Sequence, residues 1–298
     1  MTRLLCAILV TVASCVTVSL TAQSPAPTRG TLYIVGGGPQ PAALVQEFVD
    51  LAGGRGKARI VVFAMASASG ARSGEAKAAD LRALGAEARN VWITREQAMT
   101  DSVARLLDGV TGVWFGGGDQ NRLANVLRGT PTERAIHARY AAGAVIGGTS
   151  AGAAVMSAVM ITGSERTPGG ARPDTTLDWV TIARDNTATT DGFSLMDNAV
   201  IDQHFLRRKR HNRLISLVLE RAPHLGAGID ESTALVVRAD GTWQVRGASV
   251  VVIYDARQAT VSPVGLVLGA SGMRVHVLPA GSTFDPRTGT SVLGAPPR

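Results

Sequence analysis

Short apolar runs alternate with amphipathic segments through the first half of the chain. Val, Ile, Leu and aromatic residues dominate these runs, which predict buried strands at residues 31–35, 59–64, 90–94, 112–115 and 144–147. The spacing of apolar positions between them predicts helices at residues 42–51, 76–84, 119–127, 132–142 and 151–160. Strands that are apolar on both faces and alternate with helices are typical of a parallel sheet covered on two sides, so we expect an α/β fold.

The pattern changes in the second half of the chain. Residues 163–192 combine Pro and Gly with mixed polar residues and are interpreted as a long surface insertion, a flap beside the functional site. A strand at 198–201 and a helix from about 208 to 221 are predicted next. From Thr233 onward, Val and Gly with hairpin-like spacing predict antiparallel strands at the sheet edge. We therefore expect a single domain over residues 31–298.

The amino terminus has the layout of an export signal. One positive charge precedes an apolar run over residues 4–20, and small residues follow it. This predicts a secretory signal peptide over residues 1–24 and a short linker over residues 25–30. The alternatives are a lipoprotein anchored through Cys15 and an uncleaved membrane anchor. No later run is long and apolar enough to span a bilayer, so we expect a secreted or periplasmic protein without stable membrane insertion after processing.

Composition narrows the chemistry. Apolar residues make up 45% of the 298 residues, which excludes a globally disordered chain. The two cysteines, Cys6 and Cys15, both lie in the predicted leader, so the remaining chain has no disulfide, zinc-thiolate site or cysteine nucleophile. The net charge of +7 is concentrated in residues 207–213, a run without the interleaved aromatic residues of a single-strand binding groove. We expect no nucleic-acid partner, no metal and no cofactor.

The segment around Ser150 is the most informative for chemistry. A predicted strand leads into Gly148, Ser150 and Gly152 with a spacing of two, followed by small residues that open a helix. This G-x-S-x-G pattern is that of a nucleophile elbow, in which the serine projects from the carboxyl end of a strand. The N–H of Ala151 would then face a developing oxyanion. The alternative is a serine N-cap in a Gly-rich turn.

A second Gly-rich turn covers residues 116–118. It also follows a predicted strand and opens a helix, so the alternative is a phosphate-binding or purely structural loop. Beside a serine nucleophile, Gly118 or Asp119 could supply the second N–H of an oxyanion hole, and Gln120 would point into the site as a binding residue.

His204 is the best candidate for the base that a serine nucleophile requires. It ends a predicted buried strand, where polar residues should face a cleft. If the strand continues, Asp202 and His204 share one face and Gln203 takes the other. An imidazole base also needs an acid to orient it, and the spacing leaves Asp202, Asp230 and Glu231 open as candidates. The alternative is a partly exposed histidine without a catalytic role.

The basic run begins three residues after His204. Arg210 and Arg213 would share one face of the predicted helix, whereas Arg208 would lie at its start. Because guanidinium groups bind carboxylates in bidentate geometry, these arginines suggest a pocket for a substrate that carries carboxylates.

Taken together, these motifs resemble the cyanophycinase-like serine peptidases of peptidase family S51, which also contains the α-aspartyl dipeptidases. The resemblance covers roughly residues 31–260 and rests on motifs in this order: Gly116-Gly-Gly-Asp-Gln120, Gly148-Thr-Ser150-Ala-Gly-Ala, Asp202-Gln-His-Phe205, Arg208, Arg210, Arg213 and Gly228-Ile-Asp-Glu231. It implies a flavodoxin-like three-layer α/β sandwich, related to the class I glutamine amidotransferases, with a mostly parallel central sheet and C-terminal antiparallel additions. It also implies that a homodimer is one of the assemblies open to the protein.

The resemblance implies a role for each motif residue. Ser150 would be the nucleophile, His204 the base and Glu231 the acid that orients it. The implied oxyanion hole is made of Gly118, Asp119 and Ala151, and the implied substrate-binding residues are Gln120, Asp202, Gln203, Arg208, Arg210 and Arg213. Acidic groups such as Asp202 would hold a substrate cation, and the arginines its carboxylates.

The family's polymer, cyanophycin, has a poly-aspartate backbone with arginine on each side chain. Enzymes of the family release β-Asp-Arg dipeptides from it through an acyl-enzyme. Three hypotheses follow for this chain: a secreted cyanophycin hydrolase, a related serine peptidase for other β-aspartyl or acidic peptides, and an inactive periplasmic binding protein. Residues 163–192 and Gly192-Phe-Ser-Leu195 depart from the family pattern, which bears on polymer specificity and not on catalysis.

Overall fold

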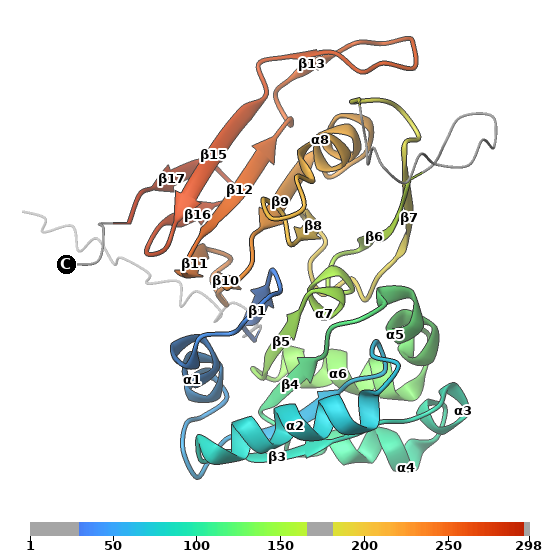
Figure 1. Ribbon diagram of the computed structural model, residues 1–298, viewed down its shortest axis with the longest axis vertical. Helices are drawn as coiled ribbons and strands as arrows, with labels where there is room; N and C mark the ends of the chain where they lie inside the picture. Colours follow the sequence, from blue (N-terminus) through green and yellow to red (C-terminus); the bar gives the residue numbers. More distant parts are fainter. Residues whose placement is uncertain (1–29, 166–180, 295–298) are drawn as a thin grey trace, which may run out of the picture.

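The computed structural model describes residues 30–165 and 181–294 (Figure 1). The predicted signal peptide, Cys15 and nearly all of the predicted linker lie outside the described residues, as do residues 166–180 of the predicted insertion. Among the helices of the described ranges, none combines the length and apolar character needed to cross a bilayer.

A nine-stranded sheet forms the centre of the described structure, with strand order β17-β16-β11-β10-β1-β5-β4-β2-β3 (Figure 1). The parallel part comprises β1 (Leu32–Val35), β5 (Val145–Thr149), β4 (Gly112–Phe115), β2 (Arg59–Phe63) and β3 (Glu87–Asn90). The antiparallel additions beside β1 are β10 (Thr233–Val237), β11 (Trp243–Gly247), β16 (Thr283–Asp285) and β17 (Thr290–Val292). The predicted α/β class, with a parallel core and C-terminal antiparallel strands, is confirmed.

A second sheet, which the sequence pattern does not separate from the first, packs beside it (Figure 1). Its strands, in order, are β15 (Arg274–Pro279), β12 (Val250–Asp255), β9 (Leu225–Ile229) and β8 (Val200–Gln203). Two ribbons complete the described strands: β6 (Val159–Glu165) with β7 (Thr187–Asp191), and β13 (Thr260–Val261) with β14 (Ala270–Ser271). The described ends of the predicted insertion therefore include a strand pair.

Strand alternation explains how the layers form. On β1, Tyr33 and Val35 pack into a core with α1 (Ala42–Leu51) and α2 (Gly70–Ala83). Leu32 and Ile34 face the opposite core, which contains residues of the second sheet and of α5 (Gln120–Leu127), α6 (Pro131–Ala141) and α7 (Ala151–Ala154). The far face of the second sheet is covered by α8 (His211–Glu220). Short helices lie between β3 and β4: α3 (Arg95–Ala98), α4 (Asp101–Ala104) and the 3₁₀ helix η1 (Arg105–Leu107).

Several predicted boundaries are corrected. The helix expected over residues 151–160 ends at Ala154, because the Ser157 hydroxyl bonds the Ala154 carbonyl and the chain then enters β6. The strand expected at 90–94 lies at 87–90, because Thr94 caps α3 through the amide of Gln97. Helix α2 begins at Gly70, and α8 begins at His211 after a turn.

The two sheets meet at the functional end of the molecule. Ser150 follows β5 of the first sheet, and His204 follows β8 of the second. Glu231 lies in the short connection from β9 in the second sheet to β10 in the first. Residues far apart in sequence are thus brought to one edge, where the carboxyl ends of β5, β8 and β9 converge.

Candidate active site

Ser150 occupies a strained turn between β5 and α7. Its backbone has φ 55° and ψ −113°, a conformation that non-glycine residues rarely adopt. A β-carbon at Gly148 would lie 2.5 Å from the Gly152 carbonyl oxygen, and one at Gly152 would lie 2.2 Å from that of Phe115. The turn therefore requires glycine on both sides of the serine, which is the packing reason for the G-x-S-x-G pattern.

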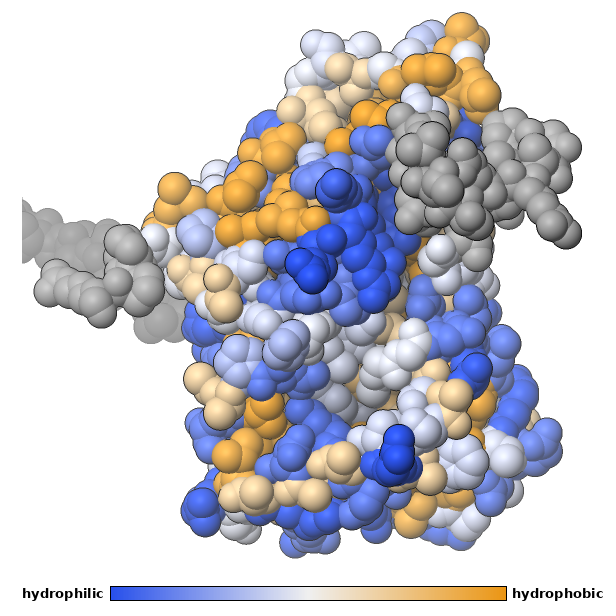
Figure 2. All heavy atoms as spheres, viewed as in Figure 1, coloured by the Kyte–Doolittle hydropathy of each residue, from blue (hydrophilic) through white to orange (hydrophobic). Residues whose placement is uncertain are grey.

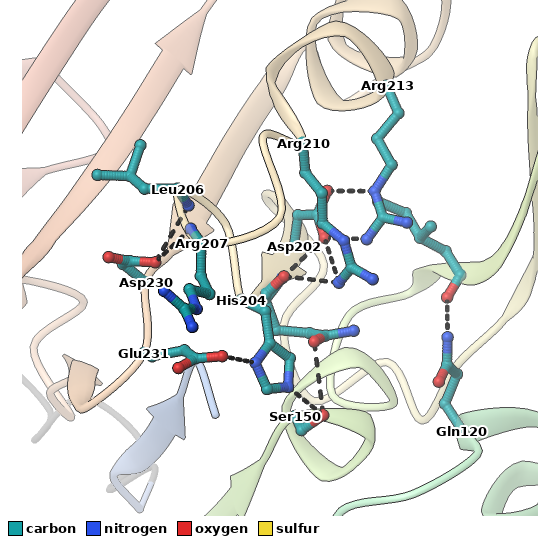
Figure 3. Close-up of polar contacts among 12 residues, drawn as sticks. Gln120, Ser150, Asp202, His204, Leu206, Arg207, Arg210, Arg213, Asp230 and Glu231 are labelled. Atoms are coloured by element: carbon teal, nitrogen blue, oxygen red, sulfur yellow. Dashed lines mark hydrogen bonds and ion pairs between the residues drawn. The ribbon is translucent and has the colours of Figure 1, made fainter. Parts of the chain in front are cut away.

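The serine, the histidine and one acid form a continuous hydrogen-bonded chain (Figure 3). His204 Nε2 lies 2.8 Å from Ser150 Oγ, and His204 Nδ1 lies 2.6 Å from Glu231 Oε1. Because an ionised carboxylate can only accept, Nδ1 carries the proton and the neutral ring presents the Nε2 lone pair to the serine hydroxyl. Of the three acids left open by the sequence, Glu231 is the one that contacts the imidazole.

The environment of His204 favours its neutral form. Burial lowers the pKa of His204 below its ordinary value, the hydrogen bond that His204 donates to Glu231 opposes that shift, and the positive charges of Arg208 and Arg210 lower the pKa further. The His204 side chain is 10% exposed and that of Glu231 27%, so one end of the pair is open to solvent.

The loop after β1, whose sequence is Gly36-Gly37-Gly38, packs against His204 and Glu231. The Gly36 carbonyl accepts the His204 amide at 2.7 Å, and the Gly37 carbonyl accepts the Ser232 amide at 2.9 Å. A β-carbon at Gly37 would lie 2.4 Å from His204 Cε1, and one at Gly38 would lie 2.8 Å from the Glu231 side chain. Bare backbone at these positions lets the loop pack directly on both groups. The signal that could have found it is the position of the glycines at the carboxyl end of a strand beside β5.

Backbone donors beside Ser150 suit an oxyanion. In the described part of the chain, the N–H groups of Ala151 and Gly118 have no hydrogen-bond acceptor, and a β-carbon at Gly117 would contact Ser150 Cβ at 3.5 Å. The expectation for Asp119 is corrected, because its N–H donates to the Ala66 carbonyl at 2.9 Å while its carboxylate caps α5. Ala151 and Gly118 remain the donors available for an oxyanion.

Asp202 and Arg213 bind each other in the interior. Arg213 Nε donates to Asp202 Oδ2 at 2.6 Å, its Nη2 donates to Oδ1, and the side chains are 1% and 0% exposed. The expectation that Asp202 holds a substrate cation and Arg213 a substrate carboxylate is therefore corrected. The pair supports the site from behind, with Arg210 Nη1 3.7 Å from the same carboxylate.

The predicted alternation of faces along the strand does not extend to His204, because the strand ends one residue before it. Strand β8 ends at Gln203, and His204 has φ 48°, so it does not share a face with Asp202. Instead the Gln203 side-chain oxygen lies 3.5 Å from Ser150 Oγ, on the same side as the imidazole. Gln203 is thus a polar neighbour of Ser150.

The other predicted binding residues differ in availability. Gln120 is buried, and its amide nitrogen donates to the Ile161 carbonyl at 2.8 Å, so it holds β6 against α5. Arg210 is largely buried and donates to the Gln203 carbonyl at 2.7 Å. Arg208 is exposed, and its guanidinium has no hydrogen bond or ion pair within the described residues. It is the cation of this set that a ligand can reach.

The hydropathy of the surface agrees with the exposed position of Arg208. Figure 2 shows strongly hydrophilic residues gathered over the region where Figure 1 places β8, β9 and the start of α8. The exposed residues of the connection from β8 to α8 are Arg207, Arg208 and Lys209. Within the described ranges, no group of His, Cys, Asp and Glu side chains has an arrangement that could hold a metal ion.

Comparison with known proteins gives a consistent result. Residues 32–245 match the family described as Peptidase family S51. Proteins named cyanophycinase from Trichormus variabilis and from a Nostoc species are each 33% identical over 277 residues, which cover 89% of this chain and 89% of theirs. The crystal structure of a peptidase from an acI-B1 Actinobacterium is 23% identical, covers 84% of this chain and 98% of its own, and superposes with a TM-score of 0.59. That likeness agrees with the fold class.

Proposed function

The chain belongs to peptidase family S51, and from this premise we propose that Ser150, His204 and Glu231 are the catalytic triad of a serine peptidase that hydrolyses cyanophycin. The observation that carries the proposal is the chain of contacts from Ser150 Oγ to His204 Nε2 at 2.8 Å and from His204 Nδ1 to Glu231 Oε1 at 2.6 Å. Membership of a peptidase family favours an enzyme over the hypothesis of an inactive periplasmic binding protein.

Acylation follows from the tautomer that Glu231 imposes. Ser150 Oγ attacks the carbonyl carbon of the scissile amide while its proton passes to His204 Nε2. The negative charge that forms on the carbonyl oxygen is met by the N–H groups of Ala151 and Gly118, and one such donor is worth about 10²–10³ in rate. The imidazolium, stabilised by Glu231, then protonates the leaving amine as the C–N bond breaks.

Deacylation reverses these roles. A water molecule gives its proton to His204 Nε2 and attacks the ester carbon, and the imidazolium returns a proton to Ser150 Oγ as the carboxylic acid product leaves. The buried surroundings that lower the pKa of His204 keep it available as a base at neutral pH in both half-reactions.

The substrate is inferred from the relatives and from Arg208. The matched relatives are named cyanophycinase, and the chain covers 89% of their length. Arg208 is exposed and its positive charge lowers the pKa of His204, so we propose that its guanidinium binds a substrate carboxylate. In cyanophycin the aspartate side-chain carboxyls form amides with arginine, so the carboxylates proposed to bind Arg208 are the free α-carboxylates of those arginines. We propose that the product is the β-Asp-Arg dipeptide.

The test is incubation of the purified protein with cyanophycin, with products identified by mass. We expect the wild-type protein to release β-Asp-Arg and Ser150→Ala to release none. The matched control is Ser102→Ala, at an exposed serine of α4 remote from the triad, which should behave as wild type. An inactive wild-type protein that is nevertheless labelled at Ser150 by a serine-reactive phosphonate would move the substrate to other β-aspartyl or acidic peptides.

We further propose that residues 1–24 direct export and are removed, which makes the protein secreted or periplasmic. The support is the sequence pattern of one charge, an apolar run and small residues. Cell fractionation together with the amino-terminal sequence of the mature protein tests this. A mature chain that begins at Cys15 and carries lipid would favour the lipoprotein alternative, and Cys15→Ala would then abolish the anchoring.

A further inference from the structure

The residue before the catalytic acid is also engaged at the site. One carboxylate oxygen of Asp230, Oδ1, accepts the amides of Leu206 and Arg207, each at 3.1 Å (Figure 3). The other, Oδ2, accepts the Ser249 hydroxyl at 2.8 Å. Leu206 and Arg207 are the second and third residues after His204. In the described structure these two amides have no backbone acceptor, so Asp230 is what satisfies them.

The backbone that Asp230 holds is strained at His204. With φ 48°, His204 lies in the left-handed region that non-glycine residues adopt only when their surroundings enforce it. Before the strained residue, the His204 amide is fixed to the Gly36 carbonyl at 2.7 Å. After it, the Phe205 amide bonds the Ile229 carbonyl at 3.2 Å, and the next two amides bond Asp230. Asp230 thus fixes the backbone on the carboxyl-terminal side of His204.

The same carboxylate fixes the acid side of the pair. Asp230 is covalently adjacent to Glu231, and the Ser249 hydroxyl ties it to the start of β12. The loop that carries the base and the loop that carries the acid are therefore joined through the imidazole ring, through the Phe205 amide on the Ile229 carbonyl, and through Asp230. The Asp230 contacts thus help to maintain the 2.6 Å contact between His204 and Glu231.

We propose that Asp230 is a positioning residue for the general base, an inference that rests on the proposed serine peptidase function. The two adjacent carboxylates have separate roles, since Glu231 orients the imidazole ring and Asp230 orients the backbone from which that ring projects. The role of Asp230 depends on hydrogen-bond acceptance and not on charge, because the amide groups of Leu206 and Arg207 need only an oxygen acceptor.

The charges that face His204 support these separate roles. The groups that shift its pKa by charge are Glu231, Arg208 and Arg210, and Asp230 is not among them. Replacing the Asp230 carboxylate by an amide should therefore leave the electrostatics of the base unchanged. An asparagine oxygen still accepts both amides, and its NH₂ group can donate to the Ser249 oxygen.

The test compares Asp230→Asn with Asp230→Ala by the rate at which a serine-reactive phosphonate labels Ser150, across pH, and by kcat and KM on cyanophycin. We expect Asp230→Ala to slow labelling and kcat by about 10²-fold, the cost of a misplaced catalytic group. If the His204 ring is held less firmly, water reaches it and its pKa rises. Labelling should then be lost at a higher pH than in the wild-type protein. Asp230→Asn should keep most of the activity and the wild-type acid limb, a rescue that lost folding alone would not give.

Three results would overturn the inference. Wild-type labelling in Asp230→Ala would show that the contact does not position the base, and an Asp230→Asn variant as slow as Asp230→Ala would show that charge matters instead. A wild-type protein that neither cleaves nor is labelled would overturn the proposed function and the inference together. If Asp230→Ala is recovered unfolded, Asp230→Ser is measured in the same way, and its shorter acceptor should give an intermediate rate.

Discussion

Gly37 lies against the ring of His204 with no room for a side chain between them. A β-carbon at position 37 would be 2.4 Å from His204 Cε1, 2.5 Å from Nε2 and 2.9 Å from Nδ1. The loop after β1 therefore fixes one face of the imidazole by direct backbone contact, while Glu231 and Ser150 fix its two nitrogens. The position of the imidazole is therefore set by three segments of the chain that are remote from His204 in sequence.

Gly37→Ala should consequently displace the imidazole and reduce kcat. A shift of about 1 Å in a catalytic group costs on the order of 10²-fold, so a loss of that size is expected in cleavage and in phosphonate labelling of Ser150. Steady-state kinetics on cyanophycin measure it. The matched control is Gly143→Ala, because Gly143 also has a positive φ, of 97°, but its β-carbon would meet nothing within 4 Å. Equal activity losses in the two variants would attribute the effect to backbone strain alone.

Arg208 should contribute, together with burial of His204, to the pH at which the enzyme loses activity. Because burial lowers the pKa of His204 and Arg208 lowers it further, the base stays neutral down to a pH below the ordinary histidine value of about 6.5. Activity is present above the lowered pKa and is lost as pH falls through it. Arg208→Gln removes one positive charge, so the pKa should rise and the acid limb should move to higher pH.

The pH dependence of Ser150 labelling measures this in the free enzyme. Arg207→Gln is the control. Arg207 is exposed and precedes Arg208 in the chain, but it is not among the groups that shift the pKa of His204. An acid limb that stays in place in Arg208→Gln, or that moves equally in Arg207→Gln, would contradict the assignment. Arg208→Gln should also raise KM, because Arg208 is the exposed cation proposed to hold a substrate carboxylate.

The parallel sheet could be predicted because its signal is local. Strand β4 was expected at 112–115 and is observed there, since a strand buried on both faces is a continuous apolar run. The elbow at Ser150 was equally predictable, because its glycines are required by contacts within a few residues and with the neighbouring strand. These features depend on short stretches of sequence.

The division into two sheets could not be predicted. Strands β8 and β9 carry the same apolar pattern whether they pair with β1 or with each other, and pairing is decided by packing across the whole domain. For the same reason, the partner of Asp202 was missed. A carboxylate at a strand end is typical of a cleft, and only the folded chain shows that Arg213, eleven positions further on, folds back onto it.

Glu231→Gln should lower kcat far more than the loss of a surface charge does. The glutamine amide can donate to Nδ1 and thereby stabilise the tautomer that places the proton on Nε2, where it cannot accept from Ser150. In a serine peptidase the equivalent change costs about 10⁴ in kcat, and a loss approaching that is expected here. Rapid-quench or steady-state cleavage assays measure it, with Glu87→Gln as the control, an 82%-exposed side chain of β3. A loss below tenfold would argue that Glu231 does not choose the tautomer.

The pair of Asp202 and Arg213 should contribute to stability more than to ligand binding. Both side chains are buried, so Arg213→Met removes the bidentate partner of the carboxylate and leaves Arg210, at 3.7 Å, as a nearby cation. The free energy of unfolding should fall by about 3 kcal/mol. Urea denaturation measures this. The control is Arg221→Met. The Arg221 side chain is 39% exposed and its Nη2 lies 3.5 Å from Asp185 Oδ1, and surface pairs of that kind are worth about 0–1 kcal/mol. An Arg213→Met protein with wild-type stability but a strongly raised KM would instead show that Arg213 reaches the substrate, and would restore the role expected from the sequence.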